Sequence, residues 1–540
     1  MDNRLEKNNS PAWRWGIIVL AALFCIIVLL LLAPKYFRHW DEIQLRLAIN
    51  SFDLKVGHPH PPGYYLYVVL SSLASFIAPE WIEPGRIISA LAVGIIVGMI
   101  CACFPRKFTL GHLALWTLAF AIAALTSPLI YFYSLAHLAY AAEACLWLAI
   151  LLWLTRRPQG KELLAWAVFA GVAGGMRQTL AIWAIVVFCV ETVIVKDFIR
   201  LKKIPSVFLA MLFGVLLWAI PMLITVGGIH DYLEASKSIV LKNIWDKSVF
   251  VGGLPVLKER FFLMLGSTVR GLGAGIVMPF IALVLRFYYR DTVKRYDSLL
   301  LGSIISFLFY LLIIYDSEGY LISFVIVLLA YGILCIAANM NKCAPRWSLI
   351  VPIIIILVRI MEVAITPATT ESAKYFQEYK NHDIFLQQVF TTVRQNFSPN
   401  NTILVTSKEY WAYSFRHVMY YLPEYTTMQL SPDFFIAITT KQKPYLTAKD
   451  HKVWTEGPYF FDISKINASK SNMLIQNVIY MIPWDAENFI HVSCNKQTRA
   501  IPINGQQFIY LIQPTANSTV ALCNGVLCCP SHEEMNSLSQ

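Results

Sequence analysis

The sequence predicts an α-helical multi-pass membrane protein, with about 11 to 13 transmembrane helices and a small C-terminal α/β domain outside the cytoplasm. Of the 540 residues, 57% are hydrophobic and only 14% are charged, whereas ordinary soluble domains carry roughly one-quarter charged residues. Apolar runs near the ~20 residues that cross a bilayer recur from Gly16 to Thr366, after which the sequence turns polar. We therefore expect two domains, residues 1–366 in the membrane and residues 367–540 outside it.

The predicted spans are eleven apolar segments. They are residues 16–33, 87–104, 110–132, 135–154, 163–176, 180–195, 207–225, 262–285, 299–314, 321–338 and 349–365. The first has basic flanks and no cleavage-like site after it, so we expect it to stay attached as a span. A further apolar stretch, residues 64–78, is short for a span and is expected to lie at the interface or to re-enter.

Basic residues mark every second connection between these segments, as the positive-inside rule requires of cytoplasmic loops. They cluster at residues 106–107, 156–161, 196–203, 286–295 and 342–346. The opposite side then receives residues 34–84, the long loop 230–260, the turn 316–320 and the whole tail. Because topology explains most of the net charge of +11, we expect no nucleic-acid partner.

The tail alternates short apolar runs with turns rich in proline and glycine, and it has a helical stretch near residues 385–393. This pattern predicts a small α/β domain. Four late cysteines lack the paired spacing of a zinc site, so one or two disulfides are expected if the tail is extracytoplasmic. These cysteines are Cys494, Cys523, Cys528 and Cys529.

The first outer loop carries the first candidate site. Asp41 and Glu42 follow the first span closely, and a carboxylate there can accept the proton of a hydroxyl that attacks an activated sugar. Alternatively, Asp41 caps a short helix, because Gln44 follows at the third position. Prolines then hold His58 and His60 in place, and with no further His or Cys nearby, anchoring or hydrogen bonding to a phosphate or sugar is favoured over metal binding.

Three arginines lie near the outer ends of predicted spans: Arg86, Arg177 and Arg270. Arginine in hydrocarbon is costly unless it meets a partner, and a lipid phosphate suits its planar fork of donors. The alternatives are snorkelling to the interface for Arg86 and, for Arg270, an internal salt bridge with Glu143 or Glu362.

Further polar residues are expected on the same outer face as Asp41. Each alone is an ordinary boundary residue, but their convergence predicts a binding site. They are His137, Tyr140, Asp316, Glu318 and Tyr320.

These residues resemble the GT-C superfamily, the integral-membrane glycosyltransferases that include protein O-mannosyltransferases and lipid A aminoarabinose transferases. The resemblance covers about the first two hundred residues well and the rest only in layout. It departs at His137, where many relatives carry arginine, and in the tail. The matching segments are Trp40-Asp41-Glu42, His60-Pro61-Pro62-Gly63-Tyr64, Arg86-Ile87-Ile88-Ser89-Ala90-Leu91, Ser127-Pro128-Leu129-Ile130-Tyr131-Phe132 leading to His137 and Tyr140, and residues 171–179 with Gly-Gly-Met-Arg-Gln-Thr.

The resemblance implies transfer of a sugar from a polyprenyl-phosphate donor to an extracytoplasmic glycan, lipid or protein. It implies that Asp41 is the base of an inverting displacement, that Glu42 and His60 shape the site, and that Arg177 and Arg270 hold the lipid phosphate. It further implies a bacterial inner-membrane location with the tail in the periplasm. No Asp-x-Asp occurs in the first outer loop, so we favour a metal-independent enzyme over one that uses a divalent metal.

Two other functions fit the composition. A lipid or solute transporter, or a flippase, also places arginine and glutamate in the membrane, but it predicts inverted repeats, and the sequence shows no clear internal symmetry. A membrane-anchored binding protein would need far fewer than eleven spans.

Overall fold

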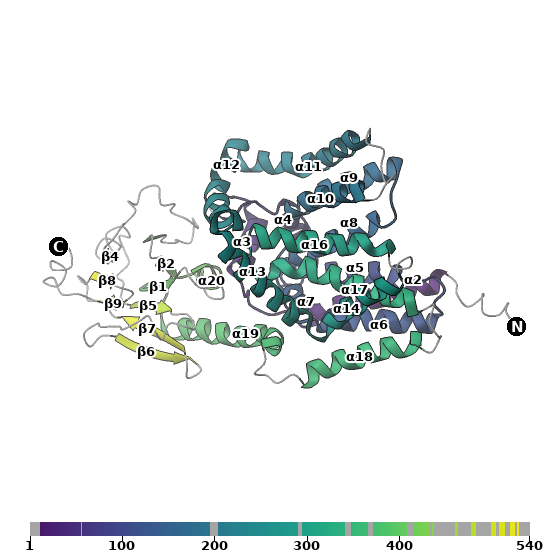
Figure 1. Ribbon diagram of the computed structural model, residues 1–540. Coiled ribbons are helices and arrows are strands. Elements are labelled where there is room, and N and C mark those ends of the chain that lie inside the picture. The colour runs from purple at the N-terminus through teal and green to yellow at the C-terminus, as the bar shows by residue number, and fades with distance from the viewer. Residues whose placement is uncertain are drawn as a thin grey trace. The chain divides into compact units, whose positions relative to one another are not determined.

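The computed structural model forms two compact units, which are described separately (Figure 1). The membrane unit comprises Met1–Lys35 and Leu45–Glu378, and the C-terminal unit comprises Tyr36–Gln44 and Tyr379–Gln540. The sequence prediction divided the chain between residues 366 and 367 and left Tyr36–Gln44 in the membrane domain. The structure describes residues 11–55, 57–194, 203–289, 294–340, 347–365, 371–407, 415–430, 435–436, 459–462, 477–481, 498–503, 507–512, 519–523 and 526–528.

The regular elements of the membrane unit are helices within its described residues, apart from an isolated bridge between Asp53 and His58. Its helices are α2 (Pro11–Leu31), α4 (Tyr65–Ser75), α5 (Pro84–Ala102), α6 (Leu110–Thr126), α7 (Pro128–Ser134), α8 (Tyr140–Leu154), α9 (Gly160–Ala173), α10 (Thr179–Ile194), α11 (Ile204–Val226), α12 (Ile229–Ser238), η2 (Ile239–Trp245), α13 (Val249–Leu272), η3 (Gly273–Ile276), α14 (Val277–Tyr288), η4 (Lys294–Tyr296), α16 (Asp297–Leu312), η5 (Glu318–Leu321), α17 (Ile322–Met340) and α18 (Trp347–Ile365). Two further helices, α3 (Trp40–Asn50) and α19 (Glu371–Asn396), belong partly to each unit.

Each predicted span coincides for most of its length with one or more helices, so the expectation of a multi-pass membrane protein is confirmed. Within the described residues, seven helices are long and apolar enough to cross a membrane, or eight if the bent pair α6 and α7 is one span. Three of the eleven predicted spans correspond to shorter helices. These are α8, α9 and α10, which have 15, 14 and 16 residues. The 64–78 stretch forms the 11-residue α4, short as predicted.

Two segments are organised differently from what the sequence alone indicated. The long loop predicted at 230–260 is largely helical, because α12, η2 and the start of α13 occupy it. The single span predicted at 262–285 is interrupted at Gly273, whose φ of 54° and ψ of −140° suit glycine. A second break separates α6 from α7 by a bend of 75°, where Pro128 offers no backbone N–H to continue the helical ladder.

Small residues let neighbouring helices of the membrane unit approach closely. A Cβ at Gly171 of α9 would lie 2.1 Å from the carbonyl oxygen of Met211 in α11. A Cβ at Gly214 of α11 would lie 2.2 Å from the carbonyl oxygen of Val168. Backbone contact through glycine is typical of helix packing in membranes, where lipid supplies no hydrophobic drive for association.

The C-terminal unit contains helix and sheet, which confirms the predicted α/β character. Its six-stranded sheet has the order β3-β2-β1-β5-β7-β6, in which β1 is parallel to both β2 and β5 and the outer pairs are antiparallel. A second sheet has the order β4-β8-β9. The elements are α20 (Phe415–Tyr421), β1 (Thr402–Ser407), β2 (Thr426–Leu430), β3 (Phe435–Ile436), β4 (Tyr459–Asp462), β5 (Asn477–Met481), β6 (Thr498–Ile503), β7 (Gln507–Ile512), β8 (Thr519–Cys523) and β9 (Val526–Cys528).

One hydrophobic core joins α19, α20 and β1 in this unit. It includes Phe390, Leu404 and Val418, together with Tyr36 from the connection between α2 and α3. The predicted disulfides lie outside the described residues, because Cys494 and Cys529 and the side chains of Cys523 and Cys528 are not among them.

Candidate active site

The acidic pair lies at the start of α3, in the C-terminal unit. Helix α3 begins at Trp40, so Asp41 is a first-turn residue and not the cap that one interpretation expected. Glu42 instead makes the reciprocal bond of a capping box, because its buried Oε1 accepts hydrogen bonds from the backbone N–H of Arg38 at 2.9 Å and of His39 at 3.0 Å, just before the helix. The positive end of the helix dipole also stabilises a carboxylate in the first turn. Glu42 therefore fixes where α3 starts, while the Asp41 side chain is partly exposed.

The histidine-proline loop is held against the turn before α10. The backbones of Asp53 and His58 exchange two hydrogen bonds, at 2.6 and 2.8 Å. Gln178, the residue after Arg177, donates from its side-chain amide to the carbonyl oxygen of Pro62 at 3.1 Å. His58 is buried, and the His60 ring lies edge-on to Tyr64 at 5.2 Å. The loop is thus anchored by backbone and side-chain hydrogen bonds.

Arg86 and His137 are both buried in the membrane unit, so the snorkelling alternative for Arg86 is wrong. The Arg86 guanidinium donates to the carbonyl oxygen of Pro34, just after α2. His137 packs over α5, since a Cβ at Gly85 would lie 2.0 Å from its ring, and edge-on to Tyr67 at 5.9 Å. These two residues join α2, α5 and the connection between α7 and α8.

Arg177 lies in a buried box of tyrosines. Its Nη1 is 2.7 Å from Glu143 Oε2, and the two side chains are 7% and 1% exposed. Its guanidinium lies 5.0 Å from the ring centre of Tyr140, 5.6 Å from that of Tyr310 and 4.6 Å from that of Tyr320. Arginine over aromatic faces is attracted by the ring quadrupoles. The structure therefore brings three predicted site residues together, Tyr140, Arg177 and Tyr320, around a neutralised charge.

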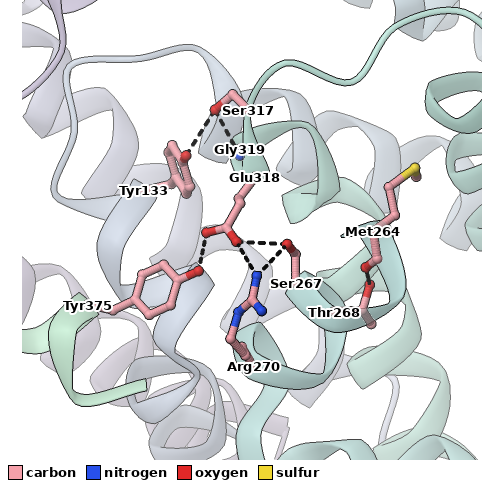
Figure 2. A network of polar contacts seen from close by, with 9 residues as sticks. All are labelled: Tyr133, Met264, Ser267, Thr268, Arg270, Ser317, Glu318, Gly319 and Tyr375. Carbon is pink, nitrogen blue, oxygen red and sulfur yellow. Dashed lines mark hydrogen bonds and ion pairs between the residues drawn. The ribbon is translucent and has the colours of Figure 1, made fainter. Parts of the chain in front are cut away.

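Arg270 and Glu318 form a second, more open network (Figure 2). Arg270 Nη2 is 3.0 Å from Glu318 Oε1, and the Ser267 hydroxyl donates to the same oxygen at 2.7 Å. The Tyr375 hydroxyl, from the first turns of α19, donates to the other oxygen. The side chains of Arg270 and Glu318 are 36% and 30% exposed. Within the part of the chain that the structure describes, Arg270 pairs with Glu318 and not with Glu143 or Glu362, the alternatives that the sequence suggested.

The sequence analysis missed a fourth arginine, Arg359 of α18, whose side chain is 1% exposed. Its Nη1 lies 2.5 Å from Glu362 and donates to the Leu272 carbonyl at 2.8 Å, and its Nη2 donates to the Ser127 hydroxyl at 3.2 Å. It therefore ties the break after α13 to the break after α6. The Arg-x-x-Glu spacing within an apolar helix is the signal that would have found it, because residues three apart share a helix face. Tyr310 and Tyr375, also missed, carry no such signal.

Among the described residues, one group of possible metal ligands lies close enough to share an ion. It consists of His230, Asp231 and Glu234 in α12. Asp231 already pairs with Lys55 at 2.9 Å, and acidic surface groups are common without a metal, so we assign none there. The group is separate from the histidine-proline loop.

Comparison with known proteins identifies the fold. No family model matches the chain, and no curated protein matches its sequence. The crystal structure of ArnT from Cupriavidus metallidurans in the apo state is similar with a TM-score of 0.56, at 13% identity, over 94% of this chain and 100% of that one. The structure of the same enzyme bound to undecaprenyl phosphate is similar with a TM-score of 0.55, at 11% identity, over 93% and 99%. The GT-C-like fold predicted from the sequence is thereby confirmed.

Proposed function

We propose that the chain is a GT-C glycosyltransferase that transfers a hexosyl or pentosyl group from a polyprenyl-phosphate donor to an extracytoplasmic acceptor. The observation that carries the proposal is the ArnT-like fold over 94% of the chain. An ArnT structure of that fold was obtained with undecaprenyl phosphate bound, which supports a polyprenyl-linked donor here. The acceptor class is a glycan, a lipid or a protein, and the expected location is a bacterial inner membrane with the C-terminal unit in the periplasm.

Asp41 is proposed as the base of the reaction. The acceptor hydroxyl attacks the anomeric carbon, its proton passes to the Asp41 carboxylate, and the polyprenyl phosphate leaves with the electrons of the broken bond. The product is inverted at the anomeric carbon. Because the leaving group is already a phosphate, the enzyme mainly needs to align the nucleophile and to stabilise the charge of the leaving group. We favour a metal-independent step over one that uses a divalent metal.

For the phosphate we propose Arg270 over Arg177. Arg177 is 7% exposed and its charge is balanced by Glu143, so it serves chiefly to organise the tyrosine box. Arg270 is 36% exposed and shares its charge with Glu318, which is 30% exposed. A lipid phosphate could compete for Arg270 with bidentate, charge-assisted hydrogen bonds, which are the strong kind. Glu318 would then set how tightly the donor binds.

The test is transfer of radiolabelled sugar from polyprenyl-phosphate donors by membranes that contain the protein. Extracts are fractionated into lipid, polysaccharide and protein, so the labelled fraction names the acceptor class. Asp41→Asn should abolish the label without preventing insertion, whereas the exposed Asp246→Asn should retain it. An active Asp41→Asn protein would remove Asp41 from the mechanism. No transfer from any common donor by correctly inserted wild-type protein would overturn the enzymatic function.

A further inference from the structure

The nine residues Tyr36–Gln44, which carry Asp41, are held by helices of the C-terminal unit. The backbone N–H of Tyr36 donates to Asp383 Oδ1 at 2.9 Å, and that of Phe37 donates to the Tyr421 hydroxyl at 2.8 Å. His417 Nε2 lies 3.2 Å from the Phe37 carbonyl oxygen. Side chains of α19 and α20 therefore satisfy consecutive backbone groups just before α3.

Aromatic packing reinforces these hydrogen bonds. The Tyr36 ring lies edge-on to Phe390 at 5.6 Å and to Tyr421 at 5.0 Å, inside the core that α19 shares with α20. The Arg416 guanidinium lies 5.4 Å from the ring centre of Trp40, the first residue of α3. Paired aromatic rings contribute specific geometry in addition to buried area. The start of α3 is thus fixed by side-chain packing as well as by its backbone.

The contacts of Tyr36 and Phe37 lie only a few residues before Asp41 in the chain. Glu42 accepts from the backbone N–H groups of residues 38 and 39, which links the held residues Tyr36 and Phe37 directly to the first turn of the helix. The direction in which Asp41 projects is therefore determined by the position of Phe37 and by the cap. A general base must lie within hydrogen-bond reach of the proton that it removes, and a misplacement of about 1 Å costs on the order of 100-fold in rate.

We propose that the C-terminal unit positions the catalytic base, with Asp383, His417 and Tyr421 as positioning residues that hold the backbone before Asp41. This inference rests on the proposed function and adds to it a role for the tail. The tail then contributes to the chemical step whatever acceptor it meets. Because Arg270, the proposed phosphate ligand, belongs to the membrane unit, loosening this backbone should change kcat and leave the KM for the donor unchanged.

The experiment compares two tyrosine-to-phenylalanine variants of the full-length protein in membranes. Tyr421→Phe removes the acceptor for the Phe37 N–H. Tyr425→Phe is the matched control, since its hydroxyl also bonds backbone in the same core, donating to the Phe397 carbonyl oxygen at 2.7 Å, but does so away from Tyr36–Gln44. Tyr421→Phe should lower kcat about tenfold at unchanged donor KM, while Tyr425→Phe should keep kcat within about twofold. Equal kcat losses in the two variants, or a wild-type kcat in Tyr421→Phe, would overturn the inference.

A second pair of variants tests rescue at Asp383. Asp383→Leu removes the acceptor for the Tyr36 N–H, whereas Asp383→Asn keeps a carbonyl oxygen there. Asp383→Leu should lose kcat and Asp383→Asn should recover most of it. A loss that is the same in both would assign the effect to charge and not to positioning. Failure of the proposed function is distinguishable, because wild-type protein would then transfer no sugar at all.

Discussion

Replacing Glu143 by leucine should destabilise the membrane unit by about 3 to 5 kcal/mol, because it leaves the Arg177 guanidinium buried without its counter-ion. The structure places the loss in the upper half of that range. Arg177 is 7% exposed, so little water can compensate its charge. The hydroxyls of Thr179 and Tyr310 also lose an acceptor, at 2.8 and 3.2 Å.

The double variant Glu143→Leu/Arg177→Met removes both charges and should recover most of that loss. Replacing a whole buried ion pair by apolar residues of similar size is often neutral, so we expect the double variant to be about 2 to 3 kcal/mol more stable than Glu143→Leu alone. The free energy of unfolding is measured in mixed micelles of increasing dodecyl sulfate content, by circular dichroism. A double variant as unstable as Glu143→Leu alone would refute the ion-pair reasoning. If the double variant still transfers sugar, Arg177 does not bind the lipid phosphate.

Three further outcomes are expected. Arg270→Met should raise the KM for the donor about tenfold through loss of a charge-assisted phosphate contact, and Glu318→Gln should lower it by removing a competitor, as initial rates against donor concentration would show. Gly214→Ala should destabilise the packing of α9 on α11, whereas a Cβ at Gly111 of α6 meets nothing within 4 Å, so Gly111→Ala should be neutral or slightly stabilising in the same micelle titration. Burial is the main cause, and nearby His382 the second, that holds the pKa of His417 well below its ordinary value. The folded C-terminal unit therefore binds fewer protons than the unfolded chain. It should lose stability as the pH falls from about 6.5, by up to about 1.4 kcal/mol per pH unit. His417→Gln should flatten that dependence, measured by hydrogen exchange of α20 between pH 5 and 8.

The helices of the membrane unit could be predicted from the sequence because apolar run length is a local property. The arginine partners could not. Arg270 and Glu318 lie 48 residues apart, and which carboxylate faces a given arginine depends on the rotation and depth of two helices. The amino-acid composition does not determine the rotation or the depth of a helix. Arg177, Arg270 and Arg359 each pair with a different glutamate, respectively Glu143, Glu318 and Glu362.

The candidate site also has a part that the sequence predicted and a part that it did not. The tyrosine box around Arg177 brought together residues that the sequence had singled out, because polar residues in apolar runs are visible without a structure. The allocation of Asp41 to the C-terminal unit was not foreseeable. Its segment is tied to α19 and α20 by side chains 347 to 384 residues away, and the hydrophobic periodicity of a nine-residue loop does not report such distant partners.

The distance in sequence between Tyr36 and Asp383 also sets an order of events during biosynthesis. A ribosome adds roughly 5 to 20 residues per second, so the 347 residues between them take on the order of 17 to 70 seconds to make. Throughout that time the segment with Asp41 lacks the helices that hold it. If Asp41 is the base that we propose, a chain that ends before α19 should therefore be unable to transfer sugar.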